Sequence, residues 1–199
     1  MNPETLGAFC LFVVASSITP GPNNTMLMAS GVNFGFRSSL WHLAGVQVGF
    51  TVMLLSVGLG LQSVLQQFPQ LFDVLRYAGG SYLLWMAYKL ATAQPTTSNA
   101  PTAARPMGFW AAVAFQALNP KAWVMAVTCM STYLAPQAGL GKLLTLVGLF
   151  FLLGAPSSFL WLGFGQALRQ WLQDPVRLRT FNITMALALV VSLYPLLMG

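Results

Sequence analysis

A break inside an apolar run near the start of the chain limits the possible folds more than any other feature. Residues 19–24 read Thr-Pro-Gly-Pro-Asn-Asn, and they lie between the apolar stretches 6–14 and 26–29. Proline removes a backbone donor and clashes with the preceding helical turn, so a helix must break here. In hydrocarbon the freed backbone groups cost several kcal/mol unless protein or a water-filled cavity satisfies them. A broken helix at membrane depth therefore indicates a substrate or ion site.

The composition of the chain is that of a membrane protein. Of the 199 residues, 56% are hydrophobic and only 6% are charged, whereas soluble domains carry roughly 25% charged residues. The net charge of +6 does not indicate nucleic-acid binding, because the basic residues are scattered and lie mostly at the ends of apolar segments. The sequence predicts an all-α integral membrane protein that spans the lipid bilayer several times.

Six segments are apolar over about the 20 residues that a spanning helix needs. They are residues 5–30, 41–61, 72–91, 107–133, 143–168 and 181–197. The fourth segment is broken at Asn119-Pro120, and Pro120 lies 120 − 20 = 100 residues after Pro20.

The two matched breaks predict an internal repeat in a single transmembrane domain, residues 1–199. A linker at 92–106, rich in Thr, Ala, Ser and Pro, joins the halves 1–91 and 107–199. Three spans in each half invert the second half relative to the first, so we expect a 3+3 inverted repeat with its site between the breaks.

The basic residues at the segment ends predict the orientation. One side carries six of them and the other side carries Arg76 and Lys142. The six are Arg37, Lys89, Arg105, Arg169, Arg177 and Arg179. Because positive charge gathers on the cytoplasmic side, we expect both termini to lie outside the cytoplasm.

Lys121 is the first candidate for chemistry, since it lies inside the fourth apolar segment directly after the break. An ionisable residue at membrane depth is costly and by default functional. Its charge suits a substrate carboxylate, or the side chain gives up a proton during transport. The alternative is a lysine that extends to the membrane surface, which its position near mid-segment makes difficult.

Amides and backbone groups at the breaks are the other candidates. Asn23, Asn24, Asn119 and Gln116 donate and accept hydrogen bonds, which suits a zwitterion, although the asparagines also suit helix capping. The segment Thr19, Pro20, Gly21, Pro22 and its counterpart Pro120 would act through freed carbonyls and helix N-termini, which hold an ammonium and a carboxylate respectively.

Other sequence features point to packing rather than chemistry. Gly45 and Gly49 form a GxxxG pair that permits close helix contact within the chain, with a homodimer as the alternative. His42 and the two cysteines, Cys10 and Cys129, have no metal-binding spacing. The sequence therefore predicts no metal site and no cofactor. It also predicts no enzyme, because no nucleophilic side chain has a base beside it.

The same residues resemble the lysine exporter and homoserine–threonine efflux family, often called LysE/RhtB. The matching motifs are 19–23, Gly35-Phe36-Arg37, the glycine pair at 45 and 49, and 119–121, and the chain's length and six-span plan also fit. Residues 131–137, together with 19–24, are most similar to the cysteine and O-acetylserine exporter branch.

The resemblance implies gradient-driven export of an amino acid or close derivative across the bacterial inner membrane, with both motifs lining the path. The expected substrates are cysteine and O-acetylserine, or threonine and homoserine. A small-solute or ion channel and a non-transporting scaffold subunit are the alternatives.

Overall fold

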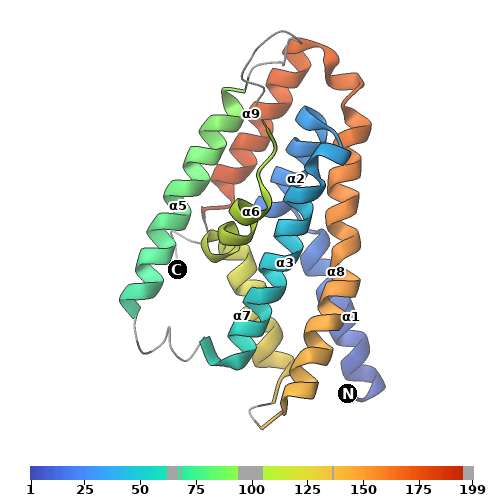
Figure 1. Cartoon of the computed structure of the whole chain (residues 1–199), viewed down its shortest axis with the longest axis vertical. Coiled ribbons are helices and arrows are strands. Elements are labelled where there is room, and N and C mark those ends of the chain that lie inside the picture. Colours follow the sequence, from blue (N-terminus) through green and yellow to red (C-terminus); the bar gives the residue numbers. More distant parts are fainter. Residues whose placement is uncertain (62–66, 68, 94–104, 136, 195–199) are drawn as a thin grey trace.

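The computed structural model describes residues 1–61, 67, 69–93, 105–135 and 137–194 (Figure 1). Within these residues the fold is all-helical, with no strand. The α-helices that the structure describes are α1 Pro3–Ile18, α2 Pro22–Phe34, α3 Leu40–Ser56, α5 Pro69–Ala91, α6 Phe109–Phe115, α7 Pro120–Tyr133, α8 Leu140–Leu168 and α9 Pro175–Val191. Short 3-10 turns occupy Arg37–Ser39, Gln116–Leu118 and Trp171–Gln173, and a π-helical turn occupies Val57–Leu61.

Each apolar segment expected from the sequence contains helix in the residues that the structure describes. The first and fourth segments are both broken at their prolines, into α1 and α2 and into α6 and α7. The predicted start of the sixth segment at residue 181 is wrong. Helix α9 begins at Pro175, because the Asp174 carboxylate caps it by accepting from the backbone N–H groups of Val176 and Arg177.

Two of the described helical stretches are long and apolar enough to cross a membrane, Arg37–Leu61 and Leu140–Leu168. The bent pair α1 and α2 makes a third if it is one span. Large apolar side chains such as Leu11, Trp41 and Leu152 are exposed on the surface of the bundle, which suits contact with lipid. The fold is consistent with a membrane protein, and the six-span inverted repeat stays a prediction.

The helices alternate in direction along the chain. In Figure 1, α1 and α2 together run upward, α3 runs downward and α5 runs upward, whereas α6 with α7 runs downward, α8 upward and α9 downward. The ends of α2, α5 and α8 gather at the top with the starts of α3 and α9, whereas α6 begins at mid-height after a segment that descends from the top. Five basic residues of the predicted cytoplasmic side lie in or next to these helix ends: Arg37, Lys89, Arg169, Arg177 and Arg179. Arg105, the sixth, lines a cavity together with Lys89.

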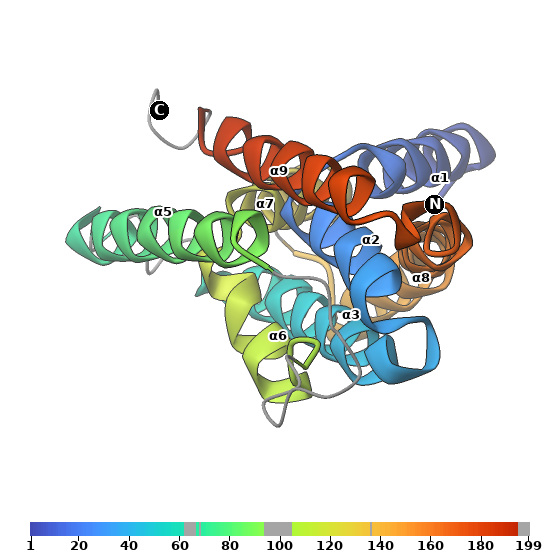
Figure 2. The same cartoon turned by 90° about the horizontal axis from the view of Figure 1, so that it is seen from above.

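Glycines bring α2 and α8 into backbone contact. A Cβ atom added at Gly31 of α2 would collide with the carbonyl oxygen of Leu162, and one added at Gly165 of α8 would collide with that of Met28. Figure 2 shows α2 near the centre of the bundle with α8 beside it. The upper half of the first broken helix is thereby held against α8 without intervening side chains.

The glycine pair of α3 packs within the chain. A Cβ atom at Gly45 would meet the Phe109 carbonyl group, and one at Gly49 would lie 2.8 Å from Gln116 Cγ. These two glycines let α3 approach α6 and the turn that precedes the second break.

Candidate functional site

The first break leaves four consecutive carbonyl groups, those of residues 17–20, without a backbone N–H partner among the described residues. Helix α1 ends at Ile18, α2 begins at Pro22, and the two axes differ by 51°. Thr19 and the N-cap residue Gly21 both have extended backbone angles. The break lies at mid-height in the bundle (Figure 1), where unpaired carbonyls would be costly in a bilayer.

Side chains from α2 and α8 bind these carbonyl groups. The Asn24 amide donates to the oxygens of Ser17 at 2.8 Å and Thr19 at 2.9 Å. The Ser157 hydroxyl donates to Ser17 at 2.8 Å, and the Trp161 indole N–H donates to Ile18 at 3.2 Å. The chain therefore satisfies the break itself, with donors that come from both halves of the sequence.

Lys121 completes this set from the second break. Its ammonium group donates to the Thr19 carbonyl oxygen, to Thr19 Oγ1 at 2.9 Å and to the Pro20 carbonyl oxygen at 3.3 Å. Its side chain also lies directly over Gly21, where an added Cβ atom would be 2.5 Å from Lys121 Cδ. The lysine that the sequence singles out thus links the two breaks, and in this structure it binds backbone carbonyls.

The second break is satisfied locally. Asn119 is the N-cap of α7, and its side-chain oxygen accepts from the backbone N–H groups of Lys121 at 3.2 Å and Ala122 at 3.4 Å. Pro120 is the first residue of α7, a position where the missing N–H has no helical partner to lose. The Trp123 indole N–H donates to the Ala117 carbonyl oxygen at 2.9 Å. No side chain from α1 or α2 is needed for this break.

A reciprocal amide pair also joins the two broken helices. Asn23 Nδ2 donates to Gln116 Oε1 at 2.9 Å, and Gln116 Nε2 donates to Asn23 Oδ1 at 3.2 Å. Gln116 is buried and also donates to the Ala112 carbonyl oxygen at 3.0 Å. All four amides expected from the sequence therefore lie at the breaks, but only Asn23 and Gln116 bind each other.

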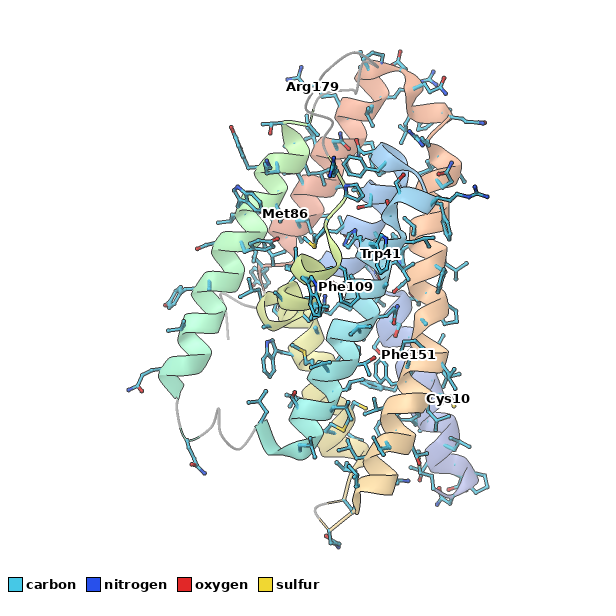
Figure 3. The ribbon with its side chains drawn as sticks, viewed as in Figure 1. Cys10, Trp41, Met86, Phe109, Phe151 and Arg179 are labelled. Atoms are coloured by element: carbon cyan, nitrogen blue, oxygen red, sulfur yellow. The ribbon has the colours of Figure 1, made fainter. Side chains whose placement is uncertain are left out.

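A small cavity of about 60 Å³, lined by both polar and apolar side chains, adjoins the first break. Asn23, Asn24, Asn119 and Lys121 line it, together with Gly21. The rest of the wall comes from α1, α3, α7 and α8, with Phe151 of α8 among the aromatic members (Figure 3).

The polar residues of this site that sequence reasoning missed include Gln47, Ser157, Ser158 and Trp161. The Gln47 amide donates to Ser158 Oγ at 2.7 Å across the cavity wall. Gln47 could have been found from its position in the middle of an apolar segment, since a buried amide needs a hydrogen-bond partner. Ser157, Ser158 and Trp161 had no comparable signal, because serine and tryptophan are common in apolar helices.

A bundle of apolar helices that joins two broken helices around a cavity lined in part by amides and a lysine has the architecture of a membrane transport protein. Among the residues that the structure describes, no group of three His, Cys, Asp or Glu side chains could hold a metal ion.

Comparison with known proteins identifies the family. The model described as LysE type translocator matches residues 14–194, so the chain belongs to the LysE family, which lies in the membrane. This confirms the resemblance found in the sequence, and it indicates a transporter rather than an enzyme.

Curated relatives give more detail. The chain is 37% identical to a cysteine/O-acetylserine efflux protein of Escherichia coli (strain K12) over 158 residues, 75% of this chain and 80% of the relative. It is 35% identical to a protein of the same name from Salmonella typhimurium, with the same shares covered. No solved structure matches the chain.

Proposed function

We propose that this protein is a secondary-active exporter of amino acids or their close derivatives, from the cytoplasm across the bacterial inner membrane. Membership of the translocator family supports this proposal, as do the efflux relatives at 35–37% identity. Cysteine and O-acetylserine are the first substrates to test, because the names of those relatives mention them. Threonine and homoserine are the second choice.

The contact between Lys121 and the first break is the observation that carries the proposal. Two backbone carbonyls and one hydroxyl surround its ammonium group. The same oxygens would bind the α-ammonium group of an amino acid, which has the same charge and the same three donors. The break is thus a binding site for ammonium groups that one of the protein's own side chains occupies.

Substrate binding then becomes an exchange. The substrate ammonium group takes the place of Lys121 at the Thr19 and Pro20 carbonyl oxygens, and the released lysine binds the substrate carboxylate. The N-terminus of α2 faces the same region, and its N-cap residue Gly21 makes no side-chain cap hydrogen bond. The positive end of this helix would add to the binding of the carboxylate.

The small volume of the cavity implies that the site opens and closes during transport. A volume of about 60 Å³ is well below the roughly 300–1,000 Å³ of ordinary ligand pockets. In our proposal the structure corresponds to a closed form in which Lys121 stands in for the substrate. The electrochemical gradient drives the cycle, and the broken helices alternate in their access to the two sides of the membrane.

Efflux from proteoliposomes tests the proposal. Vesicles would be preloaded with labelled cysteine, O-acetylserine, threonine, homoserine or lysine, with and without a proton gradient. Saturable, gradient-dependent efflux of one or two of these is the expected result. Downhill flux that does not saturate would instead indicate a channel. No flux of any of them, from protein shown to be folded and inserted, would contradict amino-acid export.

A further inference from the structure

A second and larger cavity lies between α2, α5, α9 and the segment that leads into α6. Its volume is about 380 Å³, within the roughly 300–1,000 Å³ that is usual for organic ligands. It shares no lining residue with the cavity at the break. Figure 2 shows α2 between α9 and α3, with α5 and α6 on the same flank of the bundle.

The rim of this cavity is positively charged. Lys89 of α5 and Arg105 both line it and both are exposed. The Lys89 ammonium group lies 5.5 Å from the centre of the Trp85 ring, another lining residue. Among the described residues no acidic side chain lines the cavity. Two cations without a carboxylate favour an anion and disfavour a zwitterion, whose ammonium group would meet like charge.

The walls of the cavity are apolar and adaptable. They include the side chains of Met26, Met86, Leu90, Met107 and Leu189. Met86 lies on α5 (Figure 3) and packs against the cluster formed by Met26, Leu189 and their neighbours. Methionine is flexible and polarizable, so such walls fit apolar groups of varied shape. A ligand for this cavity therefore needs an apolar body as well as a negative charge.

One buried nitrogen atom at the cavity lacks a hydrogen-bond partner. His42, which lines the cavity, is 1% exposed, and its Nδ1 lies 2.9 Å from Ser30 Oγ. Its Nε2 has no partner among the described residues. Nε2 is a donor or an acceptor according to the tautomer, and an amide group can satisfy either form. A buried polar atom without a partner is destabilising, so a ligand that supplied one would gain affinity.

We propose that this cavity binds an amphipathic organic anion with an apolar body, of the class of N-acylated apolar amino acids. The carboxylate lies between Lys89 and Arg105, the apolar side chain lies along the methionines, and the acyl amide bonds His42 Nε2. An anionic lipid shares the charge and the apolar body, so the bilayer is a second source of the same chemistry. This site is separate from the exchange at Lys121 and does not depend on transport.

Calorimetric titration of N-acetyl-L-phenylalanine tests the inference. The full chain would be held in nanodiscs of phosphatidylcholine, which has no net charge. We expect saturable binding, and at least tenfold weaker binding of L-phenylalanine, whose free ammonium group meets the basic rim. Lys89→Gln and Arg105→Gln should each weaken the binding of N-acetyl-L-phenylalanine about fivefold or more. Arg179→Gln, which removes an exposed charge outside the cavity at the same end of the bundle (Figure 3), should leave it unchanged.

Two further measurements distinguish the source of the ligand and test the role of His42. Phosphatidylglycerol in the nanodiscs would compete with N-acetylphenylalanine in the wild type if the natural anion is a lipid, and would leave binding unchanged if it is a soluble carboxylate. The His42→Gln variant, whose side chain can still donate and accept hydrogen bonds, should bind N-acetylphenylalanine more tightly than His42→Leu does. Lack of saturable binding by either anion, equal affinity for phenylalanine, or an equal loss in Arg179→Gln would overturn the inference. Lys89 and Arg105 are exposed, so folding of their variants is not at risk.

Discussion

The two helix breaks are alike in sequence and different in structure. Both combine proline with asparagine, and both interrupt an apolar segment. At the second break, Asn119 caps the helix that follows it, and the hydrogen bonds remain local. At the first break, donors from α2, α7 and α8 bind four carbonyl groups in succession.

The difference between the two breaks lies in the source of their hydrogen-bond partners. The second break is a rigid support that presents Lys121, because its capping bonds do not depend on the rest of the bundle. The partners of the first break come from several helices, and in our proposal a substrate takes the place of one of them. We therefore expect substitutions at the first break to affect transport more than those at the second, with the exception of Lys121.

Lys121→Ala should give the largest effect, because it removes the only described link between the two breaks that carries a charge. Hydrogen bonds to charged groups contribute about 1.5–3 kcal/mol each, and about 1.4 kcal/mol is a factor of ten. We expect efflux in proteoliposomes to fall at least about a hundredfold. Lys142→Ala, which removes a lysine far from the breaks, is the matched control. Unchanged efflux in Lys121→Ala would remove this residue from the mechanism.

The asparagines of the two breaks should differ in their contribution to stability. Asn24→Ala loses two hydrogen bonds to carbonyl groups, about 2 kcal/mol in free energy of unfolding at about 1 kcal/mol each. Asn119→Ala loses an N-cap, about 1 kcal/mol. Asn119→Ser should recover most of the lost free energy of unfolding, since serine also caps helices. Asn24→Ser should recover little, because the serine side chain is too short to reach the carbonyl groups of the first break. Denaturation of purified protein in detergent measures both, and equal losses at the two breaks would contradict the comparison.

Gly21→Ala should disturb the link between the breaks without disturbing the fold. The new Cβ atom would lie 2.5 Å from Lys121 Cδ, so the flexible lysine must move away from the carbonyl groups. We expect efflux to fall about threefold to tenfold, which corresponds to about 0.7–1.4 kcal/mol, with little change in thermal stability. Gly148→Ala, where an added Cβ meets nothing within 4 Å, should leave efflux unchanged.

Trp161→Phe should give the smallest effect. It removes one hydrogen bond of 3.2 Å to the Ile18 carbonyl oxygen and retains an aromatic ring. Ile18 is exposed, so we expect a loss in free energy of unfolding of at most about 1 kcal/mol. A loss as large as that of Asn24→Ala in the same denaturation series would show that α8 holds the break more strongly than α2 does.

The positions of the two helix breaks were predictable from the sequence. Prolines and glycines act on the local backbone, so the two breaks and their positions could be read from residues 19–24 and 119–121 alone. The cost of a charge at membrane depth likewise singled out Lys121. The candidate residues at the two breaks lie together in the structure, although their role in binding substrate stays a proposal.

The partners of these residues could not be predicted, because they depend on how distant segments meet. Ser157 and Trp161 reach the first break from α8, about 140 residues along the chain, and nothing in their local sequence marks them. The bonding of Lys121 to carbonyl groups was also not anticipated, since its charge suggested a carboxylate. The start of α9 was missed because the polar residues after Pro175 concealed a capped helix.

The contact between Gly31 and Gly165 has a consequence for how the molecule can move. Helix α2 belongs to the first half of the chain and α8 to the second, yet their backbones touch at two points. Sliding one past the other would drive a carbonyl group into the neighbouring main chain, with no side chain to rotate aside. We therefore expect these two helices to move as one rigid body, so that a hinge that opens the site would bend elsewhere, for example at the residues between α1 and α2.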